Sequence, residues 1–107
     1  MEKRNKVLQE AKSRLVSVFG DKIEDVILFG SQAWGTSHEW SDYDMVVIVR
    51  GENYWNVTRG VQHVLYDLEM ELGILIQDLV ISEYELYHTL RGAQPIFQKA
   101  ISEGIYA

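Results

Sequence analysis

The chain has 107 residues, a formal net charge of -6 at pH 7 and a hydrophobic content of 47%. This length supplies one domain, because a second hydrophobic core would lack residues, and the share of apolar side chains excludes a disordered chain. The excess of acidic residues argues against nucleic-acid binding, in which Lys and Arg neutralise phosphates. We therefore expect a single domain over residues 1–107 that does not bind nucleic acid.

Cysteine is absent, which excludes disulfides and thiolate zinc sites and suits a reducing compartment. The N-terminal segment has no uninterrupted apolar run, and no later run approaches the ~18 apolar residues of a membrane span. We expect a cytoplasmic protein with no membrane association. A domain this small buries only roughly two-thirds of its unfolded surface, which leaves apolar surface for a partner chain or a second copy.

Hydrophobic periodicity predicts the first elements. Apolar residues at three- and four-residue spacings predict an amphipathic helix over residues 3–19, with Gly20 as its C-terminal cap. Short apolar runs with high β propensity predict strands at residues 26–29 and 45–49. The segment between these strands is polar and mixed.

The second half repeats this alternation of helix and strand. Helical spacing predicts a helix over residues 54–72, and an apolar run predicts a third strand over residues 74–81. Ser82 and Glu85 form a capping box that begins a short helix, and Pro95 fits the first turn of another. The predicted class is α/β, a small mixed sheet flanked by helices.

Gly30 and Ser31 follow the first predicted strand directly. A glycine at such a position lets the backbone approach a ligand closely, and successive N–H groups can face an anion. The pair is therefore a candidate phosphate cradle. Taken alone, a Gly-Ser pair after a strand is more often a simple turn.

Two carboxylates lie at the entrance to the second predicted strand. Asp42 and Asp44 are two residues apart, so in an extended segment their side chains leave the same face. Crowded carboxylates repel each other, and a divalent cation with oxygen ligands, such as Mg²⁺, relieves that repulsion. The alternative is that Asp-x-Asp is a solvated turn.

Asp78 lies within the third predicted strand among apolar neighbours, where a lone ionised carboxylate is costly. If this strand lies beside the second one, Asp78 completes a three-carboxylate site for two Mg²⁺, an arrangement suited to in-line attack at phosphorus. Alternatively, an edge strand turns the acid to solvent. Trp34 and Trp40 flank the expected cleft and either stack on a base or pack against the domain.

Other charged residues are interpreted as solvated surface. Asp67, Glu69 and Glu71 follow the polar side of the second long helix. Arg91 and Lys99 could reach a triphosphate from the last helices, but surface cations are usually only solvated. None of these five residues belongs to the candidate site.

Gly30-Ser31, then ten residues, then Asp42-x-Asp44 and a later strand residue Asp78 resembles the pattern of the polymerase-β-like nucleotidyltransferase superfamily. The short chain looks like the minimal nucleotidyltransferases of that superfamily. The resemblance implies that the three aspartates are catalytic metal ligands for Mg²⁺. It also implies that Gly30 and Ser31 bind the phosphates of the nucleotide.

The same resemblance implies an activity and a partner. It implies transfer of a nucleoside monophosphate, AMP from ATP or from another NTP, to a hydroxyl. Minimal members often accompany a HEPN-domain toxin that they adenylylate as antitoxins, so a tyrosine of such a toxin is the expected acceptor. Trp34 stands where many relatives carry an arginine, which leaves open the nucleotide or acceptor contacts at that position.

A second hypothesis belongs to a different class of protein. In it the chain is a non-catalytic antitoxin subunit that blocks its partner by contact, with a vestigial nucleotide site. The apolar surface of the last helices would then form the interface.

Overall fold

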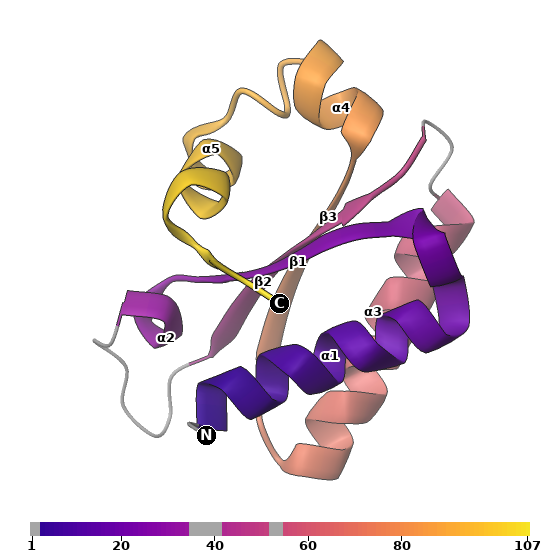
Figure 1. The fold of residues 1–107 in the computed structure, drawn as a ribbon, viewed down its shortest axis with the longest axis vertical. Helices are drawn as coiled ribbons and strands as arrows, with labels where there is room; N and C mark the ends of the chain where they lie inside the picture. Colours follow the sequence, from indigo (N-terminus) through magenta and orange to yellow (C-terminus); the bar gives the residue numbers. More distant parts are fainter. Residues whose placement is uncertain (1–2, 35–41, 52–54) are drawn as a thin grey trace.

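The structure, a computed structural model, describes residues 3–34, 42–51 and 55–107. It contains a four-stranded sheet with helices on both faces (Figure 1). The elements in chain order are α1 (Lys3–Phe19), η1 (Gly20–Lys22), β1 (Ile23–Phe29), α2 (Ser31–Trp34), β2 (Tyr43–Val49), α3 (Trp55–Leu72), β3 (Ile76–Ser82), α4 (Glu83–His88), α5 (Pro95–Glu103) and β4 (Ile105–Tyr106). The predicted α/β class is confirmed.

The sheet has the strand order β3-β2-β1-β4. Strand β1 pairs antiparallel with β2 and with β4, whereas β2 pairs parallel with β3, so the sheet is mixed as predicted. Strand β2 is therefore an interior strand with a hydrogen-bonded neighbour on each side. The backbone at Asp44, near its N-terminal end, is therefore paired with β1 on one side and with β3 on the other.

Alternation along β2 divides the core into two layers, because successive side chains point to opposite faces of a sheet. Met45 and Val47 belong to the cluster formed with α1 and α3. Val46 and Ile48 belong to the cluster formed with α4 and α5. Figure 1 shows these two pairs of helices on opposite sides of the sheet. Residues of even number in β2 therefore face α4 and α5.

The predicted starts of the later helices are confirmed, with Ser82 as the N-cap of α4. The Ser82 hydroxyl accepts a hydrogen bond from the Glu85 N–H at 3.1 Å at the start of α4, and Pro95 occupies the first turn of α5. Both helices lie on the face that α1 and α3 leave uncovered.

Arg91 ties the three elements at this end of the chain together. Its guanidinium donates to Val80 O of β3 at 3.0 Å and to the Glu85 carboxylate of α4 at 3.1 Å, and it lies 5.3 Å from the centre of the Phe97 ring of α5. The cation is thus engaged in packing α4 and α5 on the sheet.

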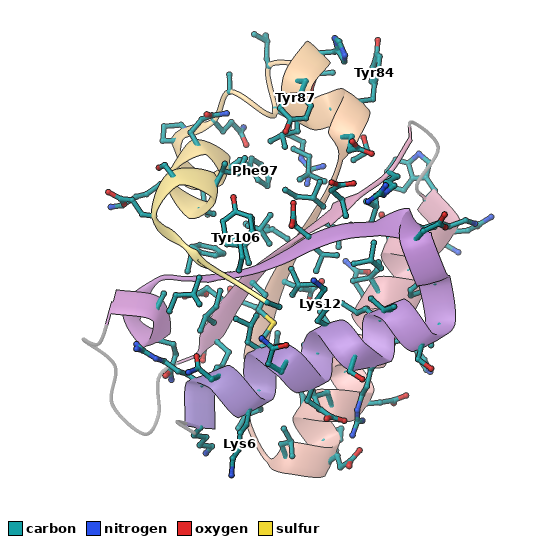
Figure 2. All side chains as sticks on the ribbon, in the orientation of Figure 1. Lys6, Lys12, Tyr84, Tyr87, Phe97 and Tyr106 are labelled. Carbon is teal, nitrogen blue, oxygen red and sulfur yellow. The ribbon has the colours of Figure 1, made fainter. Side chains whose placement is uncertain are left out.

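The last residues of the chain are joined to β1 and to α1. The Ala107 N–H donates to Val26 O at 2.9 Å, and Lys12 Nζ of α1 donates to Ala107 O at 3.1 Å. Figure 2 labels Lys12 beneath the sheet and Tyr106 above it.

Within the described ranges, none of the helices has the length and apolar character that crossing a membrane requires.

Candidate nucleotide and metal site

The turn after β1 places backbone directly against a carboxylate. Gly30 has a φ of 76°, a left-handed conformation that favours glycine, and its carbonyl accepts the Ala33 N–H at 3.1 Å as α2 begins. A Cβ built on Gly30 would overlap the Asp44 carboxylate oxygen Oδ2. Only a residue without a side chain fits this turn while Asp44 keeps its position.

Helix α2 is held by the first turn of α1. Arg4 Nη1 donates to Gln32 O at 2.9 Å and to Ala33 O at 3.2 Å. Four residues are too few for a helix to be stable by itself, because nucleation is costly. The arginine therefore positions the segment that follows Gly30 by satisfying carbonyls that the short helix leaves free.

The two acids of the Asp-x-Asp segment lie close enough for the charge of one to act on the other. Both are half-buried, Asp42 just before β2 and Asp44 within it. Burial raises the pKa of the Asp44 carboxyl, and the nearby charge of Asp42 raises that pKa further. Within the described part of the chain, no cation forms an ion pair with either carboxylate. The pair of oxygen donors fits a hard divalent cation, which would relieve this repulsion.

Asp78 lies on the other face of the sheet from Asp44. In the parallel pairing of β2 with β3, Asp78 is opposite Met45, and Asp44 is opposite Gln77. Ile76 and Val80, which alternate in phase with Asp78, pack in the cluster formed with α1 and α3. The structure therefore does not bring Asp78 onto the face that carries Asp44, and its predicted role as third metal ligand stays a prediction.

The surroundings of Asp78 are those of a second polar site. Its Oδ2 is buried and has no hydrogen-bond partner among the described residues, and the same is true of Thr58 Oγ1 of α3. Both residues line a pocket of about 420 Å³ between α3 and the outer edge of β3, with Gln62 and Trp55. Burial raises the pKa of the Asp78 carboxyl.

Glu69 is an acid that the sequence analysis wrongly placed on the solvent face of the long helix. It is half-buried, and its burial raises the pKa of its carboxyl. The charge of Asp78 raises this pKa further, and a hydrogen bond from the Ile76 backbone lowers it by less. Asp67 and Glu71 are exposed as expected, and Glu71 Oε2 lies 2.7 Å from Arg14 Nη1 in an ion pair. Glu69 follows the buried residue Leu68 directly, and this position at the border of the apolar stripe was the available signal.

The remaining expectations for the site fall partly outside the described residues. Trp40 lies outside them, as do the side chains of Ser31 and Trp34. In residues 3–34, 42–51 and 55–107, no group of three or more histidine, cysteine or acidic side chains is arranged to hold a metal ion. The described geometry therefore consists of Asp44 against the Gly30 turn, with Asp42 near Asp44.

Comparison with protein families gives the class of the chain. The family model described as polymerase beta, nucleotidyltransferase, matches residues 5–106, which include the Gly30 turn and all three aspartates. The chain belongs to this family, and its class is that of the nucleotidyltransferases.

Individual relatives narrow the comparison. The chain is 32% identical over 96 residues to "Putative protein adenylyltransferase MJ1305" of Methanocaldococcus jannaschii, a match covering 86% of this chain and 63% of that protein. The chain thus spans less than two thirds of this curated relative.

Two solved structures share the fold. A toxin-antitoxin with AMP-PNP gives a TM-score of 0.60 at 22% identity, covering 98% of this chain and 72% of that chain. The structure described as "a putative nucleotidyltransferase from Sulfolobus solfataricus" gives a TM-score of 0.61 at 19% identity. This match covers 94% of this chain and 76% of that chain.

Proposed function

We propose that the chain is a Mg²⁺-dependent adenylyltransferase that transfers AMP from ATP to a hydroxyl of a partner protein, with a tyrosine of a HEPN-type toxin as the acceptor. The observation that carries this proposal is the contact between the Gly30 turn and the Asp44 carboxylate, with Asp42 beside it. Membership of the nucleotidyltransferase family supports the reaction class. The name of the Methanocaldococcus relative supports a protein as the acceptor, and the toxin-antitoxin fold neighbour supports an antitoxin role.

The donor set fits the metal that this chemistry uses. Asp42 and Asp44 would hold Mg²⁺ through carboxylate oxygens, the ligands that this ion prefers. When bound, the ion supplies Lewis-acid stabilisation of charge on the triphosphate. Each carboxylate is half-buried, so its charge is only partly solvated, and a bound cation would stabilise the pair.

The reaction balances without any redox partner. The acceptor oxygen forms a bond to the α-phosphorus, the bond from that phosphorus to the pyrophosphate oxygen breaks, and the hydroxyl proton is released. Gly30 and Ser31 would bind the phosphates through their backbone, because the absence of a Cβ at Gly30 leaves its amide accessible. This chain's own contribution is positioning, which in phosphoryl transfer supplies most of the catalysis.

A second candidate is a non-catalytic antitoxin that blocks its partner by contact. It is favoured by apolar side chains that α4, α5 and their connection leave in solvent, since Tyr87 is 73%, Leu90 is 90% and Ile96 is 42% exposed. Tyr87 projects from α4 in Figure 2. The two candidates differ in whether neutralisation of the partner needs the carboxylates.

In the deciding experiment, the purified chain is incubated with α-labelled ATP, Mg²⁺ and a HEPN-type partner. The mass of the partner is then measured by mass spectrometry. We expect the partner to gain the mass of one AMP. The rate of this addition should fall by more than about a hundredfold in Asp42→Ala and Asp44→Asn, because each change removes several kcal/mol of charge stabilisation. Asp67→Asn, which changes an exposed acid of α3, is the matched control. Full neutralisation of the partner by Asp44→Asn, with no transfer, would establish the second candidate instead.

A further inference from the structure

We propose that Gln77 supplies the third oxygen donor of the metal site, in the place where the sequence pattern suggests Asp78. This inference rests on the proposed function, since it concerns the metal that Asp42 and Asp44 would hold. It assigns a ligand role to an uncharged residue that carries no acid-base chemistry.

The strand pairing places Gln77 next to Asp44. The two residues are Cα partners in the parallel ladder of β2 and β3. Neighbouring strands lie about 4.8 Å apart, and directly paired residues project from the same face. The Gln77 side chain is exposed, so its amide is free to turn toward the carboxylate. Asp78, one residue later, projects from the opposite face.

The packing of β3 fixes this register independently of the ladder. Leu79 and Ile81 contact the same cluster as Val46 and Ile48, under α4 and α5. They alternate in phase with Gln77. A slip of one residue would bring Asp78 beside Asp44, but it would also exchange every apolar side chain of β3 between the two core layers. Burial of these side chains therefore holds Gln77 on the face of Asp44.

The chemistry of the amide matches the position. The side-chain carbonyl of glutamine is a neutral oxygen donor of the kind that hard cations accept beside carboxylates. Two carboxylates and one amide bring two negative charges to the ion, whereas three carboxylates bring three. We therefore expect a metal site that binds its ion more weakly than a three-carboxylate site and that gains affinity when the third charge is restored.

The test measures Mn²⁺ binding to the folded chain without nucleotide, by titration followed through the electron paramagnetic resonance signal of free Mn²⁺. We expect Gln77→Ala to weaken binding by about tenfold, the scale on which loss of a supporting group lowers metal affinity. Gln77→Asp should tighten binding, and Asp78→Asn should leave it unchanged. Circular dichroism of each variant verifies that the fold is retained.

The outcomes separate this inference from the proposed function. Weakened binding in Asp78→Asn, with unchanged binding in Gln77→Ala, would overturn the inference and restore Asp78 as the ligand. Unchanged binding in both Gln77 variants would also overturn it. In either case Asp44→Asn still has to abolish Mn²⁺ binding, and retention of binding in that variant would instead contradict the proposed metal site itself.

Discussion

Gly30 and Asp44 are in such close contact that a side chain on the glycine would overlap Oδ2 of the carboxylate. The glycine ends β1 and the aspartate lies near the start of β2, and the antiparallel pairing of Phe29 with Asp44 sets them side by side. Backbone that could bind a phosphate and a carboxylate that could bind a cation are thus positioned by the same two strands.

Gly30→Ala is expected to impair transfer much more than it impairs folding. The new Cβ displaces the Asp44 carboxylate, and a displacement of about 1 Å can lower a rate by a hundredfold. The left-handed backbone adds a cost of about 1–2 kcal/mol in the free energy of unfolding. Transfer rates and urea denaturation measure the two effects.

Gly51→Ala is the matched control for that experiment. Gly51 has a φ of 86°, and a Cβ there would meet nothing within 4 Å. The control should show a similar loss of stability with unchanged transfer. Equal losses of transfer in both variants would mean that backbone strain, and not the contact with Asp44, impairs the enzyme.

Arg4→Gln is expected to lower transfer by about tenfold while costing roughly 1 kcal/mol of stability, because the hydrogen bonds to Gln32 O and Ala33 O hold α2 beside the site. The measurement is the dependence of the transfer rate on ATP concentration. Lys3→Gln removes an adjacent exposed cation and is the control. Equal effects of the two changes would point to net charge as the cause.

Arg91→Met is expected to destabilise the chain by about 2 kcal/mol, since it removes charged hydrogen bonds to Val80 O and to Glu85. The comparison is Arg50→Met, which removes an ion pair with Glu24 at 2.7 Å in which the arginine side chain is 51% exposed. A surface pair of that kind contributes at most about 1 kcal/mol. Thermal and urea unfolding should rank the two variants in this order.

Asp25 makes stability depend on pH with a definite sign. Burial, and then the charge of Glu24, raise the pKa of its carboxyl in the folded chain. The folded state then binds a proton more tightly than the unfolded state, so this group lowers stability as pH rises from its ordinary pKa through the raised one. Asp25→Asn should therefore be more stable than the parent at pH 7.

The measurement for Asp25 is urea denaturation of both chains between pH 4 and pH 7. The advantage of Asp25→Asn should shrink as the pH falls toward about 4, the ordinary pKa of an aspartate, where the parent carboxyl becomes protonated in both states. A constant difference across this range would attribute the effect to packing instead of ionisation.

Much of the fold was predictable because its main elements have strong periodicity. The helices over residues 3–19 and 54–72 match α1 and α3 closely, and the three predicted strands match β1, β2 and β3. Strand β1 begins three residues earlier than predicted, at Ile23, because a register irregularity precedes Asp25 and interrupts the alternation. Helix α2 and strand β4 are too short to give any periodic signal.

The site was predictable only where its residues are close in sequence. Gly30 and the Asp-x-Asp pair are joined by one hairpin, so pattern and spacing identify them together. The face on which Asp78 lies depends on the register of β3 against β2. A shift of one residue reverses that face, and the hydrophobic run around Asp78 fits either face by itself. Only the packed sheet distinguishes Asp78 from Gln77.

The interior position of β2 has a consequence for amide hydrogen exchange. Its backbone is paired with β1 on one side and with β3 on the other, so its amides should exchange with solvent only when the whole sheet opens. The residues from Asp44 onward would then rank among the slowest in the molecule. Substrate would then meet the Asp44 carboxylate already in place. Any adjustment to different acceptors would have to come from segments outside β2.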